Sequence, residues 1–351
     1  MDKSMRDLCR RLPKAELHLH LDGALSAGIA MRLAEQSGWR GFERPLHYHE
    51  MHRRLVVGQG TGSQHELLNF FEVPGLLLHT EQALRLVTRQ LMLEKAADNV
   101  RYFELRWAPS LHTGGGLSCG RVVEIVQDEC ERVAAGSGQV FRLIACGIRT
   151  LPLETNLAML EDVAPYIGDK LVAADYAGLE AQSPDPLEQA AFFERARELG
   201  LEITLHCGEL PGSSHRILEV VEKLAPARIA HGAGSVDDPE LCALLAGRGV
   251  CLDLCPTSNI QAGLYPDYAS FPVAPLVAAG VPVSISSDCS VVCDVCLSDE
   301  YANLLEAGCL DLPALRRLNM NALAHSFLPE AEKRRLRDEF TAEWDACSRG
   351  L

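Results

Sequence analysis

The sequence predicts an α/β fold, a (β/α)8 TIM barrel, and three features support this prediction. Short apolar runs rich in β-branched residues recur along the chain, amphipathic helical patterns separate them, and the runs number eight. Strand, helix and strand in alternation are typical of a parallel sheet with crossover helices. Eight repeats of this unit favour a sheet that closes into a barrel.

The eight candidate strands are nearly continuous apolar runs, which is expected when both faces of a parallel sheet are buried. They cover residues 15–20, 101–107, 141–147, 171–176, 202–206, 227–231, 249–254 and 281–287. Helical patterns lie between them, for example at 186–199, 214–224 and 238–247. The last of these begins with Asp-Pro, and proline suits the first position of a helix.

A long insertion, at about residues 23–100, separates the first candidate strand from the second. It has helical patterns at 26–37, 65–71 and 81–98, and a Gly/Gln-rich stretch at 58–64. An insertion after a barrel strand lies at the C-terminal face of the barrel, where active sites are built. We therefore expect a helical cap over a pocket. The alternative is a set of extra helices packed on the side of the barrel.

Length and composition are compatible with one domain. A chain of 351 residues is long enough for two average domains, but a barrel with insertions also reaches this length. Residues 298–349 have the pattern of several closing helices. We interpret residues 1–351 as a single barrel.

Charge and hydropathy exclude several classes of partner. The chain has 33 Lys+Arg against 48 Asp+Glu, a net charge of −15, so it has no overall basic surface for a nucleic acid. No stretch approaches the roughly 18 apolar residues that a membrane-spanning helix needs. Residues 1–12 contain no apolar run typical of a signal peptide. We expect a cytoplasmic protein that acts on a small molecule, and the oligomeric state stays open.

The cysteines allow two interpretations. Thirteen cysteines spread over a long chain are typical of free thiols in a reducing compartment. However, Cys251 and Cys255, and likewise Cys293 and Cys296, have spacings that resemble those of metal ligands. Because nearly 40 residues of strand and helix pattern separate the two pairs, a compact structural zinc site is the weaker interpretation.

Histidines and carboxylates recur at the ends of the candidate strands. His18 and His20 end the first strand, and alternate strand residues share a face. His206 ends the fifth strand and Glu209 follows it, while His231 ends the sixth and Asp288 follows the eighth. Since the carboxyl ends of all barrel strands meet at one rim, we expect these side chains to converge.

Three imidazoles and one carboxylate suit zinc or another first-row divalent ion, with a position left for water. Such an ion lowers the pKa of its water from about 15.7 toward 7. Glu209 and His231 are then available to move protons. These residues predict metal-assisted hydrolysis without identifying the substrate.

The sequence resembles the adenosine deaminase family of metal-dependent amidohydrolases. Residues 13–23 read PKAELHLHLDG, and the family begins P-K-x-E-L-H-x-H-L-D-G. Further family-like motifs, which extend the resemblance over about residues 13–335, are 175–178 (D-x-A-G), 206–209 (H-x-G-E), 228–232 (R-x-x-H-G), 255–259 (C-P-x-S-N), 297–301 and 326–328.

The resemblance implies a role for individual residues. It implies that the metal ligands are His18, His20, His206 and Asp288. Glu209 would protonate the ring nitrogen beside the carbon under attack, and His231 would orient and deprotonate the water. Gly178 would offer its backbone to a purine ring, and Asp22 would bind the sugar end. The implied reaction is hydrolytic deamination of adenosine or a close analogue, with one Zn²⁺ per chain and loss of ammonia.

Cys289 departs from the family pattern. The family usually reads T-D-D-P here, whereas this chain reads Ser287-Asp288-Cys289-Ser290. In the family the second aspartate bonds the purine at N7, and a thiol is a weak donor and acceptor. Loss of such a buried contact costs about 1–3 kcal/mol. The substrate is therefore either adenosine bound with less discrimination at N7, or a modified or 7-deaza amino-heterocycle.

Two other functions remain as alternatives. One is a catalytically silent barrel that binds nucleosides, and the presence of Glu209 and His231 beside a full ligand set argues against it. The other is a different amidohydrolase reaction, such as cleavage of a cyclic amide. Glu209 disfavours that reaction, because in the family an acid there serves to protonate a ring nitrogen.

Overall fold

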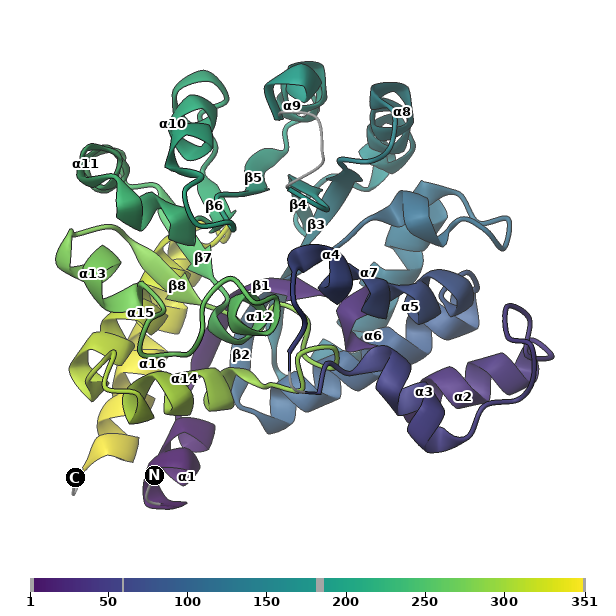
Figure 1. The fold of residues 1–351 in the computed structure, drawn as a ribbon, viewed down its shortest axis with the longest axis horizontal. Coiled ribbons are helices and arrows are strands. Elements are labelled where there is room, and N and C mark those ends of the chain that lie inside the picture. The colour runs from purple at the N-terminus through teal and green to yellow at the C-terminus, as the bar shows by residue number, and fades with distance from the viewer. Residues whose placement is uncertain (1–2, 59, 181–185, 350–351) are drawn as a thin grey trace.

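The computed structural model describes residues 3–58, 60–180 and 186–349, and the predicted (β/α)8 barrel is confirmed (Figure 1). The sheet has eight strands in chain order, and every neighbouring pair is parallel. The strands are β1 (Lys14–His20), β2 (Val100–Trp107), β3 (Val140–Ile148), β4 (Leu171–Ala177), β5 (Glu202–Cys207), β6 (Arg228–His231), β7 (Cys251–Leu254) and β8 (Val283–Ile285).

The barrel closes between the end of β8 and β1 through the backbone of Asp288. The Asp288 N–H donates to the His18 carbonyl at 3.2 Å, and the Asp288 carbonyl accepts from the His20 N–H at 2.8 Å. Strand β8 is shorter than the predicted 281–287, because the Ser287 N–H leaves the ladder and donates to Glu16 Oε1 at 2.8 Å. The closing bonds therefore lie at the C-terminal rim.

The helices after the strands surround the sheet (Figure 1). They are α7 (Cys119–Ser137), α8 (Leu153–Val163), α9 (Ala190–Glu198), α10 (Ser214–Lys223), α11 (Pro239–Arg248), α12 (Pro256–Gln261), α13 (Val273–Ala278), α14 (Leu297–Glu306), α15 (Leu312–Ala324) and α16 (Glu330–Ser348), and α1 (Lys3–Arg11) precedes β1. Helix α11 begins as its sequence predicts, because the Asp238 side chain accepts from two backbone N–H groups. Gly249, in the left-handed conformation, ends it.

The segment between β1 and β2 is helical. It holds α2 (Ala27–Gln36), α3 (Tyr48–Leu55), α4 (Gln64–Leu68), α5 (Glu72–Leu77) and α6 (Glu81–Ala97). Helix α3 was not predicted; it begins at a capping box of His47 and Glu50 and buries Met51 and Leu55. In Figure 1, α2 and α3 extend away from the strands, whereas α4 lies toward them.

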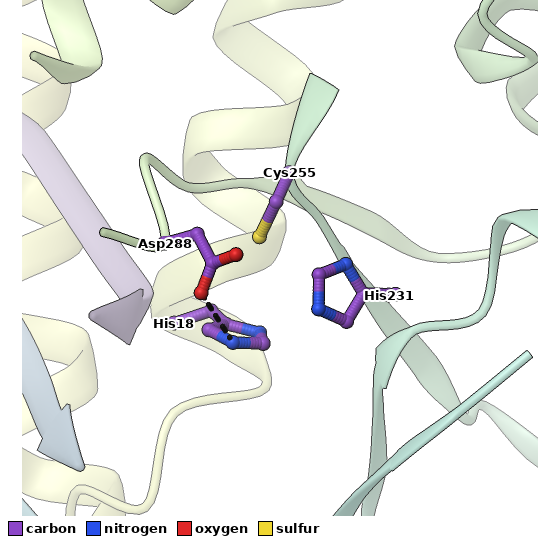
Figure 2. Close-up of side chains that lie close together, drawn as sticks. All are labelled: His18, His231, Cys255 and Asp288. Atoms are coloured by element: carbon purple, nitrogen blue, oxygen red, sulfur yellow. Dashed lines mark ion pairs between the residues drawn. The ribbon is translucent and has the colours of Figure 1, made fainter. Parts of the chain in front are cut away.

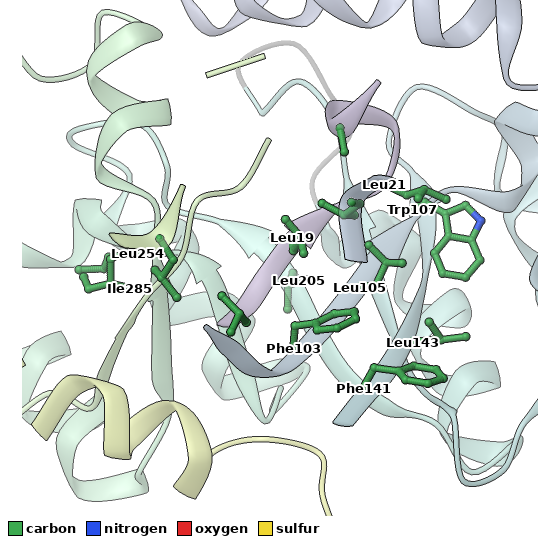
Figure 3. Close-up of a cluster of buried hydrophobic side chains, with 14 of the residues drawn as sticks. Leu19, Leu21, Phe103, Leu105, Trp107, Phe141, Leu143, Leu205, Leu254 and Ile285 are labelled. Atoms are coloured by element: carbon green, nitrogen blue, oxygen red, sulfur yellow. The ribbon is translucent and has the colours of Figure 1, made fainter. Parts of the chain in front are cut away.

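Apolar side chains fill the layer between the strands and the surrounding helices. Figure 3 shows Leu19 on β1, Leu105 on β2 and Leu143 on β3 in this layer, and all three are fully buried. Complete burial of such a side chain contributes about 1.5–3 kcal/mol. This layer holds the strands in register beneath the rim.

The inside of the barrel is polar, so the prediction of nearly continuous apolar strands is wrong for one face. Strand β2 alternates Phe103 and Leu105 with Glu104 and Arg106, and all four are buried. The charged residues pair across the barrel. Arg106 Nη1 lies 3.1 Å from Asp175 Oδ2 on β4, and Glu104 bonds Arg228 on β6. Buried charges need such partners, because an isolated one is costly.

Among the described residues, no helix is both long and apolar enough to cross a membrane.

Replacement of Arg228 by methionine tests the interior ion pairs. Arg228 is fully buried and bonds Glu104 and Asp253, so Arg228→Met leaves two carboxylates without their partner. We expect the free energy of unfolding to fall by about 3–5 kcal/mol, as measured by urea denaturation. Arg195→Met, which removes an exposed pair with Glu161, should change it little. Equal effects of the two substitutions would contradict this account.

Candidate metal centre and active site

Four side chains from three parts of the barrel converge at the rim. His18 and His20 come from β1, His206 from β5, and Asp288 follows β8. The Nε2 atoms of His18 and His20 are 3.1 Å apart, and those of His20 and His206 are 3.2 Å apart. Asp288 Oδ1 lies 3.2 Å from His18 Nε2 and 3.5 Å from His20 Nε2. The structure thus brings together all four predicted ligands.

The spacings from His18 Nε2 to His20 Nε2 and to Asp288 Oδ1, and from His20 Nε2 to His206 Nε2, suit ligands of a small divalent cation. Zinc–nitrogen bonds of about 2.0–2.1 Å in a tetrahedral site place neighbouring ligand atoms about 3.3 Å apart. Burial lowers the pKa of His20 to about 3, and burial and Arg106 hold the pKa of His18 well below its usual value. His18 and His20 are therefore neutral, and each can offer a nitrogen lone pair to a metal ion. An N3O donor set of this kind suits a first-row divalent metal.

The carboxylate of Asp175 orients His206. Its Nδ1 lies 2.9 Å from Asp175 Oδ2, which fixes the Nε2 atom as the free ligand. Burial raises the pKa of Asp175, but His206 and Arg106 outweigh burial and hold it well below its usual value. Asp175 therefore stays ionised and pairs with both neighbours.

His231 and Asp288 both have left-handed backbone conformations, with φ of 64° and 60°. Non-glycine residues rarely adopt this region, and such strain concentrates at functional sites. His231 ends β6, and its Nε2 lies 3.9 Å from Glu209 Oε2. The imidazole is 2% exposed, and its Nδ1 has no hydrogen-bond partner.

Cys255 also lies at this site, which the sequence did not predict. Figure 2 shows the side chains of His18, His231, Cys255 and Asp288 pointing toward one another, and one potential ligand atom from each lies within 4.8 Å of the others. Within the described part of the chain, no group of potential ligands pairs Cys251 with Cys293 or Cys296. The structure therefore gives no support to a separate zinc site built from the two cysteine pairs.

Glu209 is held on the loop that follows β5. The Glu180 carboxylate accepts the backbone N–H groups of Gly208 at 2.8 Å and Glu209 at 3.0 Å. Asn259 Nδ2 donates to Glu209 Oε1 at 3.2 Å, and Gln64 Nε2 donates to Oε2. Burial raises the pKa of Glu209, and Asp288 and Glu180 add to the shift. The Glu209 carboxyl group therefore keeps its proton to a higher pH than an ordinary glutamate does.

A cavity of about 490 Å³ opens beside the four ligand residues. Its walls include Leu67, Leu68 and Phe71 from the segment after β1, Ile148 at the end of β3, and Leu179 after β4. Asp22, Gly178 and Cys289, the predicted substrate contacts, also line it. No described residue that lines the cavity is a lysine or an arginine. The volume suits a ligand of small-molecule size.

Cys289 packs directly on the turn that follows β1. A Cβ atom on Gly23 would lie 2.6 Å from Cys289 Cβ, so only glycine fits there. The thiol lies 3.5 Å from Asp288 Oδ1, and burial holds its pKa well above the usual value. Cys289 therefore presents a neutral thiol at the cavity wall.

Several residues at the site were not predicted. Asp175 and Asn259 lie inside motifs that the sequence contains, but nothing in those motifs shows that they bond His206 and Glu209. Gln64 lies in a short polar stretch of the insertion without a recognisable motif. Its contact with Glu209 spans 145 residues of chain, so only the folded structure shows it.

Comparison with known proteins agrees with this geometry. A sequence model of the family described as adenosine deaminase matches residues 13–343. An adenosine deaminase of Lacticaseibacillus casei (strain BL23) is 32% identical over 336 residues, which is 95% of this chain and 97% of that protein. An adenine deaminase of Cupriavidus necator is 31% identical over 345 residues, or 98% and 95% of the two chains.

The crystal structure of an adenine deaminase from Arthrobacter aurescens superposes with a TM-score of 0.87 at 27% identity. The alignment covers 95% of this chain and 99% of that one. Similarity in sequence and in structure therefore extends over nearly the whole barrel, including the segment between β1 and β2.

Substitution of a ligand residue should weaken metal binding more than substitution of Asp175, which orients the ligand His206. His18→Ala and Asp288→Ala each remove one of four convergent donors, so we expect loss of the bound metal. Asp175→Asn keeps the ligand set but weakens the orientation of His206, and affinity should fall about 10- to 100-fold. Elemental analysis and competition with a chelator measure both effects. Wild-type metal content in Asp288→Ala would contradict the assignment.

Proposed function

The chain belongs to the adenosine deaminase family, and from this membership we propose a zinc-dependent hydrolytic deaminase of adenosine or a closely related aminopurine nucleoside. The protein is a metal-dependent aminohydrolase. In the proposed reaction, one water replaces the amino group of the ring, and the products are the oxo-purine nucleoside and ammonia. The convergence of His18, His20, His206 and Asp288 beside Glu209 carries this proposal.

Zinc is the proposed metal, and another first-row divalent ion is the alternative. The imidazoles of His18, His20 and His206 and the carboxylate of Asp288 would hold it. When bound, the ion would lower the pKa of a coordinated water to about 7 and so supply a nucleophile at neutral pH.

The protein's own side chains would move the protons. Glu209 would hold a proton on its carboxyl group and donate it to the ring nitrogen beside the carbon under attack, so that the ring accepts electron density. His231, 3.9 Å from Glu209, would orient the attacking water and accept its proton. Asp288 would help to orient the water. Each of these three groups lies on a different strand end.

The cavity favours a substrate without a phosphate. Asp22 and Asp288 line it with acidic side chains, and no described lining residue is a lysine or an arginine. Phosphate recognition in proteins depends mainly on arginine, lysine or helix N-termini. We propose that Gly178 contacts the ring with its backbone, that Asp22 binds a sugar hydroxyl, and that the apolar wall at Leu67 and Phe71 excludes water.

A second candidate substrate is a modified or 7-deaza aminopurine nucleoside. Cys289 supports it, because a neutral buried thiol is a poor partner for a ring nitrogen such as N7. A heterocycle without an acceptor at that position would lose nothing by the change from aspartate to cysteine.

We place the protein in the cytoplasm, without a nucleic-acid partner. All thirteen cysteines are free, which favours a reducing compartment, and the net charge of −15 repels polyanions.

The proposed activity is tested with a panel of substrates. Purified protein is incubated with adenosine, 2′-deoxyadenosine, adenine, adenosine monophosphate and 7-deazaadenosine, and ammonia release and ultraviolet absorbance are followed. We expect turnover of a nucleoside and little turnover of the monophosphate. Absence of turnover with every aminopurine by the metal-loaded protein would refute the proposal, and a preference for adenine would replace the nucleoside with the free base.

Glu209→Gln should nearly abolish turnover while the metal stays bound. The amide cannot donate a proton to a ring nitrogen, and Glu209 is not one of the four convergent ligands. Because burial raises the pKa of Glu209, the wild-type rate should fall as the pH rises past that pKa, since the acid form is then lost. Steady-state kinetics against pH and metal analysis measure these effects. Full activity in the variant would remove Glu209 from the mechanism.

Cys289→Asp separates the two candidate substrates. In its protonated form, a buried aspartic acid would donate a hydrogen bond to N7 of adenosine, so kcat/KM for adenosine should rise about 10- to 100-fold relative to 7-deazaadenosine. Cys289→Ala, which has no hydrogen-bond donor, serves as the matched control. An unchanged ratio for both variants would show that residue 289 does not contact the ring.

A further inference from the structure

Gln64 begins α4 and places a buried amide among apolar neighbours. Its side chain is 7% exposed and lines the same cavity as Glu209. Leu67 and Leu68, one turn further along, line the cavity with apolar side chains. Burial of an amide among such groups is unfavourable unless its donor and acceptor are both bonded. The hydrogen-bond partners of Gln64 therefore indicate what a polar side chain does at this position.

The nitrogen of the Gln64 amide bonds Glu209, and its oxygen bonds Glu180. Its Nε2 donates to Glu209 Oε2, and its Oε1 accepts the Glu180 N–H at 3.0 Å. Glu180 in turn holds the backbone of Gly208 and Glu209 with its carboxylate. Gln64 thus contacts the Glu209 carboxylate directly and the Glu209 backbone through one intermediate residue.

The two oxygens of Glu209 are held by different parts of the chain. Asn259, on α12, donates to Oε1 at 3.2 Å, while Gln64 reaches Oε2 from the segment between β1 and β2. Oε2 is also the oxygen that lies 3.9 Å from His231 Nε2. Without Gln64, Asn259 would be the remaining side-chain donor to the carboxyl group within the described part of the chain. A single hydrogen bond would fix the plane of the group less firmly than two.

We propose that Gln64 is a positioning residue for Glu209, which fixes the plane of the carboxyl group and ties α4 to the loops after β4 and β5. This inference rests on the proposed function, in which Glu209 is the proton donor. Gln64 transfers no proton itself. Its effect is on the angle from which the Glu209 oxygen meets the ring nitrogen, and small misplacements of a catalytic group lower rates by up to about 100-fold.

A positioning role predicts a particular kinetic pattern. Loss of Gln64 should lower kcat and kcat/KM together, because alignment of the acid matters in the transition state. KM should stay nearly constant, since the apolar wall at Leu67 and Phe71 is intact. If Gln64 only packed in the cavity wall, a leucine in its place would leave kcat unchanged.

Two variants and a matched control test the proposal. Gln64→Leu removes both hydrogen bonds, and Gln64→Glu keeps an acceptor for the Glu180 N–H but loses the donor to Glu209. We expect kcat to fall about 10- to 100-fold in both, with KM within about threefold of wild type. Gln36→Leu, at the exposed end of α2, is the control and should match wild type. Metal content and thermal unfolding, measured in parallel, show that each variant is folded.

A double-mutant cycle gives a readout that is independent of turnover. The affinity for inosine, the oxo product, is measured by calorimetry in wild type, Gln64→Leu, Glu209→Ala and the double variant. If Gln64 acts through Glu209, its effect on affinity disappears once the carboxylate is absent.

The outcomes separate this inference from the proposed function. Wild-type kcat in Gln64→Leu, a rise in KM alone, or additive effects in the cycle would each overturn the positioning role while wild-type turnover stands. A wild-type protein that deaminates no aminopurine would overturn the proposed function first, and the positioning role with it.

Discussion

The backbone of Asp288 is the constraint on which the rest of the site depends. Its N–H and carbonyl close the barrel against His18 and His20, and its side chain lies 3.2 Å from His18 Nε2. The same residue therefore joins β8 to β1 and completes the set of four potential ligands. Its left-handed conformation, with φ of 60°, costs on the order of 1–3 kcal/mol. The two closing hydrogen bonds hold it in that conformation. The same bonds that close the barrel therefore also position the Asp288 side chain beside His18.

Arg106 links the ligand residues on β1 and β5 from inside the barrel. Its guanidinium donates to the Leu17 carbonyl, next to His18, at 2.7 Å and pairs with Asp175, the partner of His206. The positions of ligands on β1 and β5 are thereby linked through one fully buried cation. Replacement of such an interior by hydrophobic residues is often neutral for stability. Its value here lies in keeping Asp175 ionised and the imidazole of His206 in one orientation.

The cavity combines few polar groups with extensive apolar walls, so each polar group has a large effect on selectivity. Cys289 offers only a neutral thiol, and Asp22 and Asp288, with no lysine or arginine among the described lining residues, make the site unfavourable for anions. Gln64 is one of the polar residues on the wall formed by the segment after β1, and its side chain contacts Glu209. This contact joins the segment after β1 to the loop after β5, across 145 residues of chain.

The sequence by itself determined the barrel and the strand-end residues, because local patterns carry that information. Eight alternating units predict a closed parallel sheet, and His18, His20, His206 and Asp288 each stand at a recognisable strand end. Only the tertiary structure decided which groups meet at short range. The polar barrel interior, the place of Cys255 beside Asp288 and the contact of Gln64 with Glu209 all join residues far apart in the chain. Such contacts depend on side-chain direction and strand register, which composition and periodicity do not encode.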